Sequence, residues 1–261
     1  MRTFDKQIFW EESQGKYVGS ISQDWLQGRT AFGGIITAGA TRIAQLAEPD
    51  RPLRSLEARF FEPIGPGSFT ATLTPLRSGR SVAHVQVDLV QAERLCFRAT
   101  ACFATPRASS ITLRAASPPP GPPPADLESL PYIPDLMPAF VQHFDMRILQ
   151  GMPFSGQTEP ILDGWCRLRG GGTGVPALLA LLDAFPAPSM ALLSGPAPAS
   201  TVHWTAHLLH PGPPSPEGWF RYRAQTLAAD DGTSTFAATL WDETGTPLAW
   251  SEQLHAVFDA P

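Results

Sequence analysis

The sequence predicts an α+β protein made of two copies of one unit, a buried helix followed by an antiparallel sheet. Two apolar segments with helical spacing, at 34–47 and 175–185, are each followed by strands with alternating apolar and polar residues. The strand after each helix ends at a proline, Pro63 or Pro211, and a glycine turn then leads to two further strands. Because an overlooked repeat leads to the wrong fold, this duplication is the first fact to establish.

The first helix is expected at 34–47, where apolar side chains occupy nearly every face. Ile36, Ala40 and Ile43 recur at helical spacing, and Ile35 and Leu46 fill the other faces. A helix that is apolar all round is buried in a core rather than lying on a surface.

Four strands of the first copy follow this helix. Segments 55–61, 69–74, 83–89 and 95–103 each alternate between apolar and polar residues. Clean alternation is typical of antiparallel strands that have one covered face. Residues 17–25, before the helix, predict a short strand or loop.

A proline-rich segment separates the two copies. The run SPPPGPPP at 117–124 cannot form a helix or a central strand, so it predicts a polyproline II spacer. We therefore divide the chain into an N-terminal unit at 1–106, a Pro-rich linker at 107–138 and a C-terminal unit at 139–261. A strand-like segment at 140–149 opens the second unit.

The second copy repeats the order of the first. A glycine-rich approach at 170–174 leads into the helix, and Pro176 suits its first turn because the missing N–H has no helical partner there. Phe185 and Pro186 are expected to end the helix. The expected strands are 200–209, 219–227, 233–241 and 248–258.

Composition excludes several classes of function. With 261 residues, a net charge of −5 and no block of Lys or Arg, the chain is not expected to bind nucleic acid. It has no apolar run near the ~20 residues that span a bilayer and no signal peptide, so a soluble, cytoplasmic protein without membrane partners is expected. Cys96, Cys102 and Cys166 have no metal-ligand spacing, which predicts reduced thiols and no metal site.

Asp183 is the most informative polar residue, because it is the only ionisable side chain in the apolar segment 175–185. In the latter half of a helix it cannot be an N-cap, and the helix dipole disfavours its charge. Apolar surroundings would raise its pKa, which suits a general base that activates water. An aspartate on a solvent-facing stripe is the alternative, and the residues alone favour neither interpretation.

A doubled helix-then-strands pattern is the plan of a double hotdog, in which a curved antiparallel sheet wraps a central helix and two halves join edge to edge. The segments AFGG at 31–34, FFEP at 60–63 and LRSGRS at 76–81 resemble the first half of bacterial acyl-CoA thioesterase II. The segments around Asp183, STV at 200–202 and SEQ at 251–253 resemble its second half. The resemblance spans nearly the whole chain except the linker and implies a role in lipid metabolism.

The resemblance also implies a site. The family uses Asp, Thr and Gln together to hold the attacking water, and Asp183, Thr201 and Gln253 match those positions. A hydroxyl and an amide can orient a water without competing as bases. His203 follows Thr201 closely, so a supporting polar role is open to it. No metal or other cofactor is implied.

Phe32, Gly33 and Gly34 are candidate substrate-binding residues at the start of the first helix. Free N–H groups there could donate to a thioester carbonyl. Close packing of the helix on the sheet needs small residues equally, and we favour that interpretation.

The resulting hypothesis is an acyl-CoA thioesterase that releases a free carboxylic acid and CoA. A non-catalytic acyl-CoA or acyl-carrier binding protein is the alternative, because fold alone does not fix function. A hotdog hydratase or dehydratase is a third option, although its Asp/His or Glu/His pair is not found at the matching positions. A homodimer or homotetramer is expected, because hotdog sheets present exposed edges.

Overall fold

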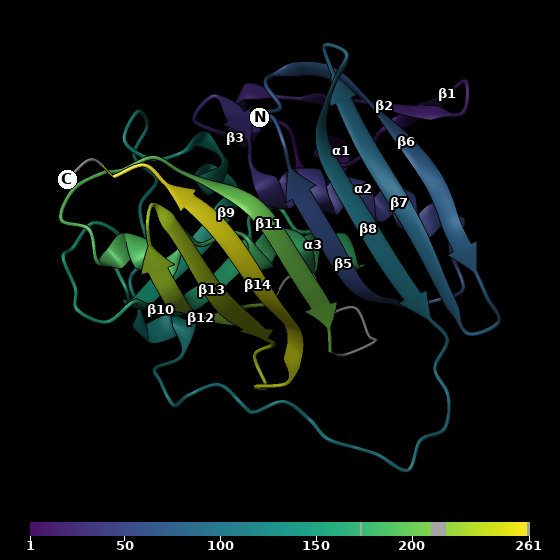
Figure 1. The fold of residues 1–261 in the computed structure, drawn as a ribbon. Helices are drawn as coiled ribbons and strands as arrows, with labels where there is room; N and C mark the ends of the chain where they lie inside the picture. Colours follow the sequence, from purple (N-terminus) through teal and green to yellow (C-terminus); the bar gives the residue numbers. More distant parts are fainter. Residues whose placement is uncertain (173, 210–217, 260–261) are drawn as a thin grey trace.

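A computed structural model of the chain describes residues 1–172, 174–209 and 218–259. Two central helices, α2 and α3, lie side by side within one curved sheet (Figure 1). The helices are α1 (Phe4–Gln7), α2 (Gly33–Ala47) and α3 (Gly174–Leu182), and the 3-10 helices are η1 (Gln23–Trp25), η2 (Pro124–Asp126), η3 (Ala139–His143) and η4 (Pro188–Ala191). No helix in the described ranges has the length and apolar character to cross a membrane.

Within the described residues, twelve strands form one antiparallel sheet in the order β1-β2-β6-β7-β8-β5-β11-β14-β13-β12-β10-β9, and β3 pairs with β4 separately. The strands of the first half are β1 (Glu11–Ser13), β2 (Lys16–Ile21), β3 (Leu26–Gln27), β4 (Thr30–Ala31), β5 (Leu53–Phe60), β6 (Gly67–Ser78), β7 (Val82–Gln91) and β8 (Arg94–Ala104). Those of the second half are β9 (Phe144–Gln150), β10 (Ile161–Leu168), β11 (Ala199–Leu208), β12 (Phe220–Asp230), β13 (Thr233–Trp241) and β14 (Pro247–Val257).

The strand order repeats symmetrically about the pair formed by β5 and β11. These two strands run antiparallel, with Ala58 opposite Trp204 and Glu57 opposite Thr205. On either side of them follow β8 and β14, then β7 and β13, then β6 and β12. This order confirms the predicted α+β double hotdog, in which two halves join edge to edge into one sheet.

Strand β10 was not predicted from the sequence. Its segment lacks clean alternation because Asp163 and Gly164 stand in its centre. Asp163 is nevertheless buried, and its carboxylate oxygens lie 2.7 Å from Arg221 Nε and 2.7 Å from Arg223 Nη1 on the neighbouring strand β12. A buried aspartate is tolerated there because each of its oxygens faces a cation.

Apart from the short 3-10 helix η2, the Pro-rich linker at 107–138 forms no helix or strand, and it is attached to the second half of the molecule. Trp165 Nε1 donates to Pro122 O at 3.0 Å, and Trp241 Nε1 donates to Ala116 O at 2.8 Å. These indole N–H groups form hydrogen bonds with backbone carbonyl oxygens that have no partner in a helix or strand of the linker itself. Pro211, expected to close a strand of the second copy, lies outside the described residues.

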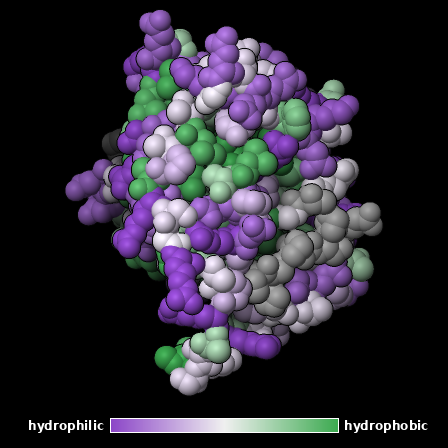
Figure 2. Space-filling model, turned by 90° about the vertical axis from the view of Figure 1, so that its right-hand side faces the viewer, coloured by the Kyte–Doolittle hydropathy of each residue, from purple (hydrophilic) through white to green (hydrophobic). Residues whose placement is uncertain are grey.

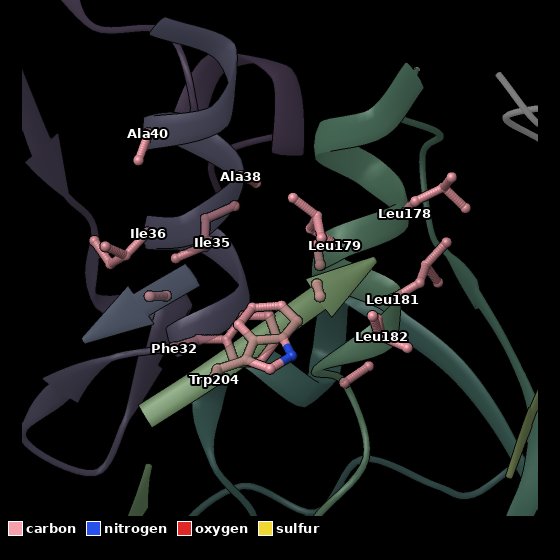
Figure 3. Close-up of a cluster of buried hydrophobic side chains, with 14 of the residues drawn as sticks. Phe32, Ile35, Ile36, Ala38, Ala40, Leu178, Leu179, Leu181, Leu182 and Trp204 are labelled. Carbon is pink, nitrogen blue, oxygen red and sulfur yellow. The ribbon is translucent and has the colours of Figure 1, made fainter. Parts of the chain in front are cut away.

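The apolar core lies between the helices and the sheet. Ile35 of α2 and Leu179 of α3 face each other across the helix pair, with Phe32 and Trp204 beside them (Figure 3). All four side chains are at most 1% exposed. Burying side chains of this size stabilises the fold by about 1.5–3 kcal/mol each.

On the surface, the face shown in Figure 2 carries an apolar area bordered by hydrophilic residues.

Candidate functional site

Asp183 lies directly after α3, whose last residue is Leu182. Its backbone N–H still donates to Leu179 O at 3.2 Å, so it continues the hydrogen bonding of the helix by one residue. The predicted helix end at Phe185 was therefore wrong by three residues, because the chain turns away after the aspartate. The C-terminal end of α3 disfavours a negative charge, so the carboxylate needs partners from elsewhere.

The start of α2 provides the first of these partners. The two helices run antiparallel, which brings the C-terminal end of α3 to the N-terminal end of α2. A Cβ atom on Gly34 would lie 3.1 Å from Ala180 Cα, and one on Gly33 would lie 2.9 Å from Asp183 Oδ2. The glycines are thus required by contact between the helices and by the approach of the carboxylate. The close packing that we expected against the sheet is present at Gly33, whose Cβ would lie 3.4 Å from Phe60 Cζ on β5, whereas the close backbone neighbour of Gly34 is in α3.

Two donors hold the Asp183 carboxylate. Gln253 Nε2 on β14 donates to Asp183 Oδ1 at 3.0 Å, and the backbone N–H of Gly34 also donates to the carboxylate. Burial raises the pKa of Asp183 to about 7, and the hydrogen bonds from Gln253 and Gly34 oppose that rise. Asp183 as a whole residue is intermediate in exposure, between buried and exposed. A carboxyl group with this pKa can accept a proton at neutral pH.

Thr201 reaches the same cluster because β11 contains a β-bulge. On β14, Thr201 pairs with His255 and His203 pairs with Leu254, so Val202 is the extra residue of the bulge. Regular alternation would place Thr201 on the outer face together with His203. The bulge instead turns Thr201 towards Gln253, and Thr201 Oγ1 lies 3.4 Å from Gln253 Oε1.

The three residues that the resemblance implied, Asp183, Thr201 and Gln253, therefore form one connected cluster. His203 does not join them, because its Nε2 lies 3.3 Å from Glu57 Oε1 at the β5–β11 junction. Phe32 is 1% exposed and its ring stacks on Phe140 with centroids 4.0 Å apart. The Phe32 ring therefore serves the core, and only the backbone at the start of α2 faces the site.

Sequence reasoning gave no role to His255, which the structure adds to the cluster. Its Nε2 lies 3.0 Å from Thr201 Oγ1 and 3.0 Å from Gln253 Oε1. Burial lowers the pKa of the His255 ring to about 4. The available signal was its position two residues after Gln253, on the same face of one strand.

The first half of the molecule has no equivalent cluster among the described residues. Strand β8 takes the place in the first half that β14 takes in the second. Its buried inward residues are Phe97, Ala99, Ala101 and Phe103, where β14 presents Ser251, Gln253 and His255. Among the described residues, the second half thus carries a polar cluster at a place where the first half is apolar.

Together the fold and the cluster define a double hotdog protein with a buried carboxylate where its two central helices meet. The acyl-CoA thioesterase N-terminal domain matches residues 21–104, and the acyl-CoA thioesterase C-terminal domain matches residues 114–257. The chain belongs to the acyl-CoA thioesterase family.

Solved structures share this fold. A protein of unknown function with a hot dog fold from Alicyclobacillus acidocaldarius has a TM-score of 0.87 and 25% identity, covering 99% of this chain and 98% of that one. A provisionally assigned thioesterase II from Thermobifida fusca has a TM-score of 0.84 and 26% identity, with 99% and 98% covered. An acyl-CoA thioesterase II from Mycobacterium marinum shares the fold at a TM-score of 0.78 and 17% identity, with 99% of each chain covered. A comparison with curated proteins gave no match.

Proposed function

We propose that the protein hydrolyses an acyl-CoA thioester to a free carboxylic acid and CoA, with Asp183 as general base. One observation carries this proposal: a carboxylate whose pKa burial raises to about 7 is held by Gln253 and by the start of α2. A group with that pKa is about half ionised at pH 7, and its ionised form is basic enough to take a proton from water.

In the proposed reaction, Asp183 removes a proton from water while the water oxygen attacks the thioester carbon. The carbonyl oxygen becomes an oxyanion, and we assign its stabilisation to the backbone N–H of Gly33 at the start of α2. The intermediate then collapses, the carbon–sulfur bond breaks, and the proton on Asp183 passes to the departing CoA thiolate. The products are a carboxylic acid and free CoA, and Asp183 returns to its ionised form.

Gln253 and Thr201 orient the water in this scheme. The amide nitrogen of Gln253 has two N–H groups, of which one is used on Asp183 and the other is available to a water beside it. Thr201 adds a hydroxyl on the far side of the same amide. Holding the reacting groups in place in this way converts an encounter in solution into a step within one complex.

A hydratase or dehydratase is the second candidate, because the cluster contains a histidine as well as an aspartate. However, His255 Nε2 is occupied by Gln253 and Thr201 rather than pointing freely beside Asp183. We therefore place the thioesterase first.

The test is thiol release measured across a panel of saturated acyl-CoA substrates from short to long chain. We expect stoichiometric free thiol and carboxylic acid with at least one chain length. Tight binding throughout the panel without thiol release would instead identify a binding protein. Addition or loss of water on enoyl-CoA or hydroxyacyl-CoA, with the thioester intact, would identify a hydratase.

The pH dependence of hydrolysis follows from the pKa of Asp183. Because the ionised carboxylate is the active form, log(kcat/KM) should rise with a slope of one below about pH 7 and level off above it. A steady-state pH profile on the best substrate of the panel measures this directly. If kcat/KM instead levelled off above a pKa near 4, the value of an ordinary carboxyl group, the environment described for Asp183 would be contradicted.

A further inference from the structure

The proposed reaction leaves His255 without a task, although this residue contacts both of the groups that orient the water. It follows Gln253 by two residues on β14, and its Nε2 is 3.0 Å from Thr201 Oγ1 and 3.0 Å from Gln253 Oε1. The ring edge also packs against Phe236, with centroids 5.0 Å apart and the planes at 79°. His255 is thus held in one place by both packing and polar contacts.

The geometry decides which ring nitrogen carries the proton. Gln253 turns its Nε2 towards Asp183 Oδ1, so the atom that faces His255 is the carbonyl oxygen Oε1. A carbonyl oxygen only accepts, so the His255 Nε2 must donate and carries the hydrogen. Because burial lowers the pKa of His255 to about 4, the ring is neutral at pH 7 and carries only one N–H. The other nitrogen, Nδ1, is buried without a hydrogen-bond partner among the described residues and therefore carries no hydrogen.

A glutamine amide can turn by half a rotation with little change of shape. The turned amide of Gln253 would present its oxygen to the Asp183 carboxylate, which would repel it. We propose that His255 is a positioning residue that prevents this turn by holding the Gln253 oxygen, an inference that rests on the proposed function for its effect on catalysis. Thr201 can support the same oxygen, but over the longer distance of 3.4 Å.

The titration of Asp183 reports the orientation of the amide. Tyr222 on β12 is one of the described residues that interact with the Asp183 carboxylate. Burial is the main cause that raises the pKa of Tyr222, and the charges of Asp183 and Cys166 raise it further. Burial also raises the pKa of Cys166 on β10, and burial lowers that of His255 on β14, so all three stay uncharged at neutral pH. When the Gln253 N–H leaves the carboxylate, one hydrogen bond to the charged form is lost and the pKa of Asp183 rises.

The experiment follows the carboxyl carbon of Asp183 by NMR in protein labelled with ¹³C at aspartate, assigned with Asp183→Asn. His255→Phe keeps a ring against Phe236 but removes the donor, whereas His255→Gln keeps an N–H donor at about the reach of Nε2. Glu252→Gln, an exposed change on the same strand, is the matched control. Should His255→Phe not fold, His255→Leu tests the same loss.

We expect the pKa of Asp183 to rise by on the order of half a unit to one unit in His255→Phe and to return in His255→Gln. An unchanged pKa in His255→Phe, or equal shifts in both variants, would overturn the proposal. In the thiol-release assay, His255→Phe should lower kcat about 10-fold with little change in KM, because orientation and not binding is lost. The NMR titration needs no turnover, so it decides the role of His255 even if the wild type releases no thiol.

Discussion

Replacing Asp183 by Asn should lower kcat/KM for acyl-CoA hydrolysis by about 10²–10⁴-fold, the range that a positioned general base contributes. The amide keeps the size of the side chain and can still accept one of its two hydrogen bonds, but it cannot take a proton from water. Thiol release and substrate binding should be measured together on the best substrate. Binding should survive, because the change removes a group that acts on water and not on CoA.

The matched control for this variant is Asp231→Asn. Asp231 is exposed in the turn between β12 and β13, and its φ of 47° is a conformation that asparagine tolerates well. Its activity should equal that of the wild type. If Asp183→Asn kept wild-type turnover while folded, Asp183 would not be the base and the proposed mechanism would be wrong.

Asp183→Asn should also reduce the pH dependence of the stability of the fold. An unfolded aspartate has a pKa of about 3.9, whereas that of Asp183 in the folded state is raised to about 7. Between these values the folded state binds more protons, so the free energy of unfolding falls as pH rises from about 4 to 7 and is constant above. The ionised carboxylate therefore costs on the order of 2–4 kcal/mol at pH 8. Thermal unfolding at pH 5 and pH 8 should show a smaller difference in Asp183→Asn than in the wild type.

Part of this site was predictable from local rules, because a lone acid in the apolar segment 175–185 indicated Asp183. Thr201 and Gln253 were implied only by the family resemblance, since alternation alone left the face of Gln253 undecided. The doubling of the helix-and-strand pattern indicated the architecture. These signals depend on periodicity, which a single sequence displays directly.

Other parts depend on contacts that periodicity does not encode. The β-bulge at Val202 reverses the face of Thr201, and no turn residue in the sequence marks it. Strand β10 was missed because its central Asp163 is compensated by arginines 58 and 60 positions later in the chain. The meeting of Gly33 with Asp183 joins the two copies, so neither copy alone could reveal it.

Gly33→Ala should impair catalysis more than stability. The new Cβ would lie 2.9 Å from Asp183 Oδ2 and 3.4 Å from Phe60 Cζ, and the aspartate side chain can move aside. Displacing a catalytic group by about 1 Å can cost about 10²-fold in rate, so we expect a loss of that order in kcat/KM. Chemical denaturation should show a change in unfolding free energy below about 1 kcal/mol, because no backbone atom is forced to move.

Gly34→Ala gives the contrasting result that makes this prediction specific. Its Cβ would lie 2.5 Å from Phe32 Cζ and 3.1 Å from the backbone Cα of Ala180, so α2 and α3 must separate. Overpacking of this kind costs about 1–3 kcal/mol, and activity should fall with it. Gly195→Ala, which meets no atom within 4 Å, is the control and should change neither quantity. If Gly33→Ala were fully active, the catalytic action of Asp183 would not depend on its close approach to the start of α2. The contact between Gly33 and Asp183 would then serve the fold and not the reaction.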